Sequence, residues 1–271
     1  MIERAIAATE ADWRAITAEV TAEELQIALA GMFAMKFMAV RFFPSLQVHA
    51  LEQLGGADEQ LQFIGAITSA ARTAVGWQAW HHWGPAILDW TGGQMGLAQT
   101  LCWLHGDSVR VRSMLVALQC AAQQNSPLPG AIAWTDPAQS IPADLTTIAS
   151  AANSLQIHLI GESQPGEQGT LSLMRGLAAE SGLVNLLFVG DEFPHLADEP
   201  IEESSTNFAH ALIAGGQSCR RLAEVPWLPQ SMVLSEAEQI VASEVYDFLR
   251  WTGQRVDAAL LRDAYDEYCD F

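Results

Sequence analysis

The sequence predicts a predominantly α-helical protein, in which an N-terminal helical bundle is followed by a small α/β unit with a terminal helical pair. Three observations lead to this fold class. Long stretches of the first half repeat apolar residues at helical spacing. In the second half, residues 156–162 and 183–192 are short apolar runs with the length of buried strands. The charge also changes, because residues 131–271 hold twenty-one acidic and only six basic residues.

The composition bounds the classes of partner and compartment. Half of the 271 residues are hydrophobic, so the chain can bury a large core, and the net charge is −19. Binding to a phosphate backbone draws on clustered basic residues, and the chain has one lysine, so we expect no nucleic-acid partner. The most apolar run, residues 28–40, is shorter than the roughly 20 residues that span a bilayer. With no signal-peptide pattern and no paired cysteine spacing, we expect a cytoplasmic protein without membrane insertion.

The first half reads as a succession of helices separated by glycine and proline. Thr21 and Glu24 form a capping-box pattern, which marks the start of a helix. Gly55 and Gly56 mark a stop, and Gly84 is followed by a proline that interrupts the helical pattern. The helices expected in this half are 2–20, 22–41, 45–54, one from about residue 58 into the tryptophan-rich segment, and 109–124.

The tryptophan-rich segment, residues 77–106, holds five of the nine tryptophans. At helical spacing, Trp77, Trp80 and His81 share one face, because residues three and four apart are neighbours on a helix. So large an aromatic area needs something to pack against. Core packing, a docking surface and a pocket for an apolar ligand all remain open. The residues predicted to bind are Trp77, Trp80, His81, Trp83 and Trp90.

Residues 125–142 contain four prolines and few charges, which is typical of a linker or a surface loop. The charge balance changes at the same place. We therefore predict two domains, an α-helical bundle over residues 1–126 and an acidic α/β unit with C-terminal helices over residues 127–271.

The second half alternates helix and strand, which indicates a parallel α/β unit. A helix is expected over residues 170–180, between the two strands at 156–162 and 183–192. Residues 234–251 and 256–268 read as the terminal helical pair, separated at Gly253.

Acidic residues follow the two predicted strands and are the candidate catalytic residues: Glu162, Asp191 and Glu192. Ligands of an open parallel sheet lie outside the carboxyl ends of its strands, so these carboxylates are candidates for acid–base work or for holding Mg²⁺. Ordinary solvated residues at strand ends are the competing interpretation. The loop at 161–169 lacks the glycine patterns of nucleotide-binding loops. His81 and His82 point about 100° apart on a helix, so no metal site and no cofactor are predicted.

The acidic second half, the aromatic-rich first half and the lack of a catalytic motif favour a non-catalytic interaction or accessory protein, such as an assembly factor or adaptor. This hypothesis implies a protein partner and allows a homo-oligomer. Two alternatives stay open. One is a small-molecule enzyme with its carboxylates at the C-terminal edge of a short parallel sheet, and the other is a carrier of an apolar ligand.

Overall fold

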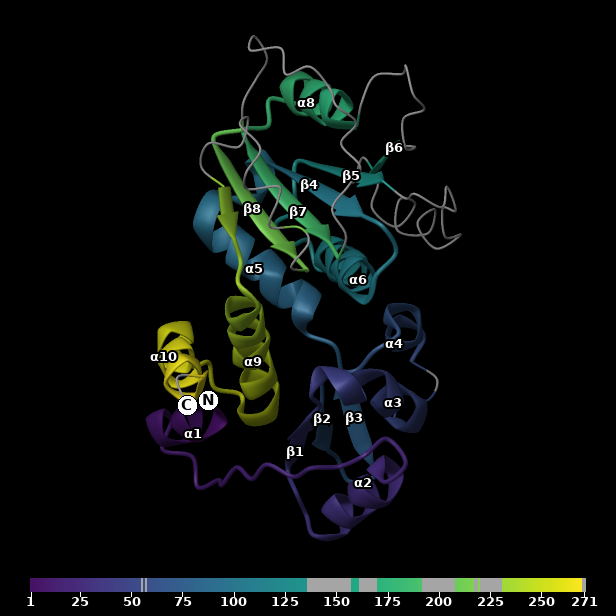
Figure 1. Ribbon diagram of the computed structural model, residues 1–271, viewed down its shortest axis with the longest axis vertical. Helices are drawn as coiled ribbons and strands as arrows, with labels where there is room; N and C mark the ends of the chain where they lie inside the picture. The colour runs from purple at the N-terminus through teal and green to yellow at the C-terminus, as the bar shows by residue number, and fades with distance from the viewer. Residues whose placement is uncertain are drawn as a thin grey trace. The chain divides into compact units, whose positions relative to one another are not determined.

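The chain is divided into two units (Figure 1). Unit 1 comprises Met1–Ala86 and Ala237–Phe271, and unit 2 comprises Ile87–Glu236. The computed structural model describes residues 1–54, 56, 58–135, 157–160, 170–191, 208–216, 219 and 231–269.

Unit 1 is built on a three-stranded antiparallel sheet in the order β1-β2-β3. Apolar residues of α2, α3 and α4, among them Leu25, Ala50 and Leu61, form a buried core with residues of this sheet. A second core joins α1 to α9 and α10 through Ile6, Phe248 and Leu261. The elements of unit 1 are α1 (Ile2–Ala8), α2 (Leu25–Ala34), β1 (Ala39–Arg41), α3 (Pro44–Leu54), α4 (Glu59–Ile64), β2 (Ser69–Arg72), β3 (Trp77–Trp80), α9 (Glu236–Thr252) and α10 (Ala258–Cys269).

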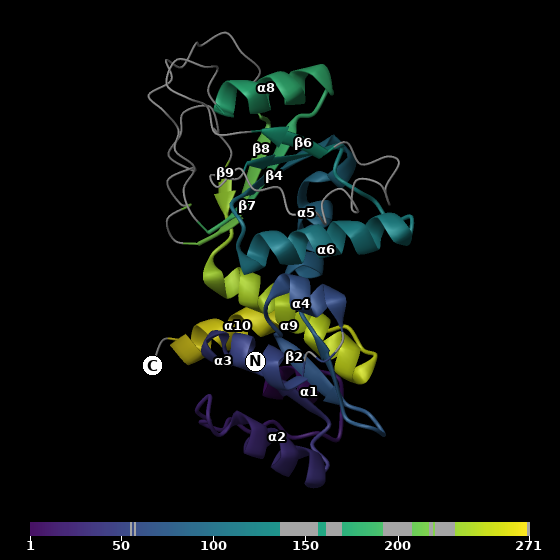
Figure 2. The same cartoon turned by 90° about the vertical axis from the view of Figure 1, so that its right-hand side faces the viewer.

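Unit 2 contains a sheet of six parallel strands in the order β6-β5-β4-β7-β8-β9. Numbered by their place in the chain, these strands run 3-2-1-4-5-6, the order of a doubly wound dinucleotide-binding fold. Figures 1 and 2 show α8 on one face of the sheet and α6 on the other. The elements are α5 (Trp83–Met95), which begins in unit 1, the 3₁₀ helix η1 (Leu97–Gln99), β4 (Thr100–His105), α6 (Val109–Gln123), β5 (Ala131–Thr135), β6 (Ile157–Ile160), α8 (Thr170–Glu180), β7 (Asn185–Gly190), β8 (His210–Gly215) and β9 (Ser231–Val233).

The prediction of a predominantly α-helical protein with an N-terminal bundle is wrong. The stretch expected to be one long helix from residue 58 ends at Gly65, whose left-handed backbone (φ 85°) closes α4, and continues into β2 and β3. Further along, all residues of β4 are buried, because a central parallel strand is covered on both faces. A short apolar run of this kind has no period-two alternation, so its pattern does not separate strand from helix.

The chain also divides at other positions than the sequence predicted. Residue 126 lies between α6 and β5, inside unit 2, and β5 pairs with β4 over five residues from Leu101↔Ala131 to His105↔Thr135. The prolines at 127 and 129 therefore belong to a connection within one sheet. Unit 1 takes its last two helices from the C-terminal end of the chain, a return that the order of the sequence does not reveal.

Several of the expected elements are confirmed. These are the helices at α3, α6 and α8, the terminal pair α9 and α10 with Gly253 between them, and the strands β6 and β7. The first two helices are shorter than expected. The first ends at Ala8, just before Glu10, which takes a positive φ of 53°, and the second ends at Ala34, because Lys36 takes a positive φ of 63° and the chain then enters β1. In the part of the chain that the structure describes, no helix has the length and apolar character needed to span a membrane.

Gly130, which leads into β5, lies so close to its neighbours that we expect any side chain there to be costly. A Cβ at this position would be 2.5 Å from the Ala98 carbonyl oxygen and 2.5 Å from Leu183 Cδ2. We predict that Gly130→Ala lowers the free energy of unfolding by about 1–3 kcal/mol through overpacking. Gly176→Ala in α8 is the control, because among the described residues no atom beyond its own turn of helix lies within 4 Å of the added Cβ, and it should be neutral or stabilise by up to about 1 kcal/mol. Urea unfolding measures both, and equal stabilities of the two variants would contradict the prediction.

Candidate active site

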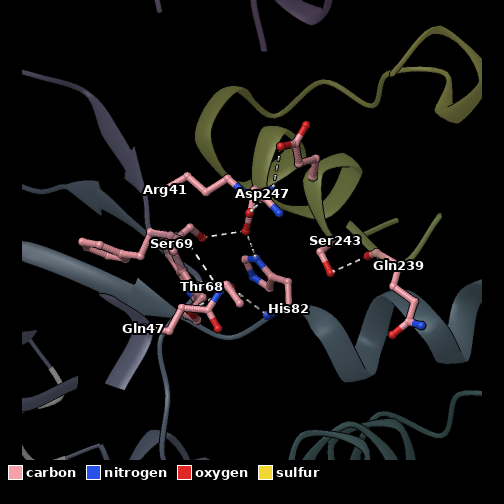
Figure 3. A network of polar contacts seen from close by, with 11 residues as sticks. Arg41, Gln47, Thr68, Ser69, His82, Gln239, Ser243 and Asp247 are labelled. Atoms are coloured by element: carbon pink, nitrogen blue, oxygen red, sulfur yellow. Dashed lines mark hydrogen bonds and ion pairs between the residues drawn. The ribbon is translucent and has the colours of Figure 1, made fainter. Parts of the chain in front are cut away.

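A cluster of buried polar side chains lies in unit 1 around Asp247 of α9 (Figure 3). Asp247 is fully buried, with an exposed fraction of 0%. Its partners come from three other segments. Arg41 is the last residue of β1, Ser69 is the first residue of β2, and His82 lies between β3 and α5.

Asp247 is held by three side chains. Its Oδ1 accepts a hydrogen bond from Ser69 Oγ at 2.6 Å and lies 2.6 Å from His82 Nδ1. Its Oδ2 accepts a hydrogen bond from Arg41 Nη1 at 3.0 Å. The same Arg41 nitrogen lies 3.3 Å from Glu244 Oε1. Asp247 therefore has partners on both carboxylate oxygens, which is what a buried carboxylate needs to remain charged.

Local structure brings these residues together. Arg41 and Ser69 are directly paired in the antiparallel register of β1 and β2, so their backbones are adjacent. Glu244 and Asp247 are three residues apart on α9 and therefore share one face of that helix. The backbone N–H of His82 donates to Thr68 Oγ1 at 3.2 Å, which fixes the turn that follows β3.

The surroundings of the two carboxyl groups move their pKa values in opposite directions. Burial raises the pKa of Asp247, but the hydrogen bond from His82 and the charge of Arg41 outweigh it, so the pKa lies below its usual value. Burial raises the pKa of Glu244; Arg41 opposes this rise and the neighbouring Asp247 adds to it. Asp247 is thus the group built to stay ionised at neutral pH.

One ring nitrogen of His82 contacts Asp247, and the other is buried without a hydrogen-bond partner among the described residues. Because the Asp247 carboxylate only accepts hydrogen bonds, the N–H group of His82 is at Nδ1 and donates a hydrogen bond to Oδ1. In the neutral form of the ring, the lone pair is therefore on Nε2. Nε2 is buried and has no hydrogen-bond partner among the residues that the structure describes. The Trp80 ring stacks on the imidazole, with centroids 5.8 Å apart and planes 20° apart. A histidine oriented by a carboxylate in this way is equipped to act as a general base and then as a general acid.

The predicted binding residues do not share one helix face. Trp77 and Trp80 lie in β3, Trp83 begins α5, and Trp90 lies further along α5, in unit 2. Trp77 packs edge-on against Phe33 and donates to the Leu29 carbonyl at 3.3 Å. Trp83 Nε1 donates to Gln239 Oε1 at 3.1 Å. The indoles of Trp77 and Trp83 are thus anchored by packing or hydrogen bonds within unit 1.

His81, the remaining predicted binding residue, is buried beside His82. Burial, together with the charge of the neighbouring His82, lowers the pKa of His81 to about 4, although Asp247 opposes the shift. His81 is therefore neutral at physiological pH. His81 was predicted to bind because it shares a face with Trp77 and Trp80 on a helix, but this stretch is strand β3 and the turn after it. The histidine that contacts Asp247 is the next residue, His82.

The predicted catalytic carboxylates are only partly placed by the structure. Asp191 follows β7 directly, as expected, and forms an ion pair with Arg110 of α6. Glu162 and Glu192 lie outside the described residues. Within the described ranges, no group of three or more histidine, cysteine, aspartate or glutamate side chains is arranged to hold a metal ion.

We predict that Glu244→Gln stabilises the protein at pH 7. A pKa raised on folding means that the protonated form is favoured in the native state, so stability falls as the pH rises from the unfolded value through the folded one. The amide of Glu244→Gln does not ionise, so the variant does not lose this stability as the pH rises. Thermal unfolding between pH 4 and pH 8 measures it, with Glu238→Gln on the same helix as a control that changes stability by less than about 0.5 kcal/mol. A Glu244→Gln variant that is less stable than wild type at pH 7 would show that the pairing with Arg41 dominates.

Comparison with known proteins identifies the fold. No known family model matches the sequence, and no curated protein sequence matches it. Among solved structures, the ligand-free 5-ketofructose reductase of Gluconobacter sp. strain CHM43 matches with a TM-score of 0.63 and 17% identity, over 98% of this chain and 92% of that one. Shikimate 5-dehydrogenase from Listeria monocytogenes, in complex with shikimate and NAD, matches with a TM-score of 0.65 and 12% identity, over 97% and 90%. The shikimate 5-dehydrogenase of Thermus thermophilus, in complex with NADP(H) and shikimate, matches with a TM-score of 0.60 and 16% identity, over 98% and 92%.

These similarities extend over almost the whole chain and establish an α/β fold of the kind found in shikimate dehydrogenases, with a parallel sheet of dinucleotide-binding topology. They contradict the prediction of a non-catalytic interaction or accessory protein, since the similar structures are dehydrogenases and reductases. The alternative of a small-molecule enzyme agrees better with them.

Proposed function

We propose that this protein is an enzyme that transfers a proton to and from a small polar molecule, with His82 as the general acid–base. One observation carries the proposal. His82 Nδ1 lies 2.6 Å from the buried Asp247 carboxylate, while Nε2 is buried with no partner among the described residues. A buried ring nitrogen without a hydrogen bond costs stability, and such costs persist where function requires them.

In the proposed reaction, Nε2 accepts a proton from the substrate and returns it in a later step. The imidazolium that forms in between is stabilised by Asp247, which stays ionised because Ser69 and Arg41 also bind it. Asp247 is a positioning residue, since it sets the tautomer and orientation of the ring. A general base of this kind contributes about 10²- to 10⁴-fold to the rate.

Small hydroxylated carbonyl compounds are the proposed substrate class. Hydroxyl and α-carbon protons are the ones that a histidine with a free ring nitrogen removes near neutral pH. The similar structures point the same way, because they are a 5-ketofructose reductase and dehydrogenases of shikimate. For this chain the substrate class is a proposal that rests on the chemistry of His82.

The experiment is a substrate screen with hydroxy acids, keto acids and ketoses, followed by proton NMR in D₂O and by absorbance in the presence of NAD or NADP. Turnover that is lost in His82→Asn and kept in His49→Asn would support the proposal. His49 is the matched control, because it lies on the surface of α3 with 44% of its side chain exposed. Turnover that survives in His82→Asn would overturn it.

Location and assembly stay predictions from the sequence. A cytoplasmic location is proposed from the dispersed cysteines, three of which, Cys102, Cys120 and Cys219, form no disulfide in the described part of the chain. A homo-oligomer or a protein partner is tested by light scattering during size-exclusion chromatography.

A further inference from the structure

The carboxyl edge of the parallel sheet in unit 2 is where a doubly wound fold holds a dinucleotide. The pyrophosphate binds at the turn from the first strand of the sheet into the helix that follows, beside the point where the strand order reverses. In this chain that turn joins β4 to α6, and the reversal lies between β4 and β7.

The β4–α6 turn has one of the three glycines that such a turn uses. Gly106 takes a left-handed conformation (φ 78°) and makes the tight turn. At the second glycine position, where the backbone must approach the pyrophosphate, stands Ser108, whose hydroxyl already accepts the Val111 N–H at 3.4 Å. At the third position stands Val111 itself, with an exposed fraction of 0%. The turn thus carries a side chain, that of Ser108, where the backbone would approach the pyrophosphate, and a buried valine where the third glycine would let helix and strand pack closely.

The charges at this edge also oppose a pyrophosphate. Asp107 lies within the turn and accepts hydrogen bonds from Arg112 Nε and Nη2, each at 2.6 Å. These bonds lower the pKa of Asp107, so it is ionised at neutral pH. Asp191, at the end of β7, forms an ion pair with Arg110 of α6 across the point of reversal. One carboxylate therefore lies within the turn and a second lies at the end of the neighbouring strand β7, and Arg112 and Arg110 are paired with them.

We infer that unit 2 does not bind NAD or NADP and that the reaction at His82 is redox-neutral. The residues present do not fit the dinucleotide that the fold family implies. The two ion pairs instead join α6 to its own preceding turn and to the end of β7. The redox-neutral reaction rests on the proposed function of His82. The inference that the β4–α6 turn does not bind a dinucleotide is independent of that function.

A redox-neutral reaction at His82 is balanced without a further reagent. In an α-hydroxy carbonyl compound, Nε2 removes the proton from the carbon that bears the hydroxyl group. The electrons of the broken C–H bond form the carbon–carbon double bond of an enediolate, while the π electrons of the carbonyl group move onto its oxygen. Return of the proton from Nε2 to the same carbon re-forms the carbonyl group and gives the substrate or its epimer. If the hydroxyl proton first passes to the other oxygen, return of the Nε2 proton to the other carbon gives the isomer.

The test combines a binding arm and an exchange arm on the full chain. Wild-type protein is titrated with NADH and NADPH by isothermal calorimetry and by ligand fluorescence, after its folding has been checked by circular dichroism. We expect no saturable binding up to about 1 mM, the upper end of ordinary substrate constants. Saturable binding of either dinucleotide with a dissociation constant below about 1 mM overturns the inference.

The exchange arm follows deuterium incorporation from D₂O into α-hydroxy carbonyl compounds by NMR, without any dinucleotide. Incorporation that falls by about 100-fold or more in His82→Asn supports a redox-neutral reaction. Turnover that appears only when NAD or NADP is added overturns it. If neither binding nor exchange is found, the proposed function of His82 fails, while the inference that the turn does not hold a dinucleotide stands.

Discussion

Replacement of His82 by asparagine is expected to lower kcat by about 10²- to 10⁴-fold and to leave the protein folded. Asparagine can keep a hydrogen bond to Asp247 through its side-chain amide, in place of the 2.6 Å contact of Nδ1. It has no group that titrates near neutral pH, so it cannot accept a proton and return it. Steady-state kinetics on the substrate identified by the screen measures the loss, and thermal unfolding checks that the fold is kept.

The pH dependence separates a catalytic role of His82 from a structural one. If Nε2 is the general base, kcat/KM of the wild type should fall on the acid side of a single ionisation, because the protonated ring has no lone pair to offer. The residual activity of His82→Asn should lack that ionisation. A variant with reduced activity but the same acid limb would show that another group is the base and that His82 acts only in packing.

Thr68 offers a milder change beside the same ring. Its Oγ1 accepts the backbone N–H of His82 at 3.2 Å and donates to the Trp80 carbonyl at 3.2 Å. Thr68→Val removes both hydrogen bonds of Thr68 Oγ1 at nearly constant side-chain volume. The His82 ring should then be held less firmly in place, but it keeps its ability to accept and return a proton. A loss of kcat that is much smaller than in His82→Asn, with the acid limb unchanged, is the expected result.

The sequence predicts helices and strands correctly where residues close in the chain, such as glycine stops and turn residues, determine their ends. The helices α3, α6 and α8 and the terminal pair appear where periodicity and glycine stops place them. Strands β6 and β7 were found because turn residues bound a short apolar run. Central strands β4 and β5 were missed because burial on both faces removes the alternation that marks a strand. With those two strands read as helix and linker, the doubly wound topology could not be inferred.

The candidate active site could not be predicted from the sequence, because its residues are far apart in the chain. His82 and Asp247 are 165 positions apart, and Ser69 and Asp247 are 178 apart. No spacing rule connects residues at such separations, since they meet only because α9 returns to unit 1 after the whole of unit 2. The one local signal was the His81-His82 pair, and on the predicted helix its two rings would have pointed apart. In the observed turn, His82 is the one that Asp247 holds.

Asp247 is expected to be the most sensitive position for stability. Asp247→Ala would leave Arg41 with Glu244 as its remaining close carboxylate in the described cluster, at 3.3 Å, and would remove the acceptor of Ser69 and His82. Removing one partner of a buried ion pair costs about 3–5 kcal/mol, which is a large part of the roughly 5–15 kcal/mol that stabilises a typical protein. Chemical denaturation of wild type and variant measures the loss.

Asp247→Asn tests whether the charge, rather than the shape, supplies that stability. The pKa of Asp247 is lowered on folding, so its contribution is complete above the unfolded value of about 3.9 and is lost as the pH falls through the folded value. The asparagine variant should therefore be less stable than wild type at pH 7, and the difference should shrink below about pH 4. Adding Arg41→Gln should recover part of the loss, because it removes the buried charge left without its closest partner. If the loss in free energy of unfolding of the double variant equals the sum of the losses in the two single variants, Arg41 and Asp247 are not coupled. In that case, Asp247 would be kept ionised by its hydrogen bonds to Ser69 and His82 alone.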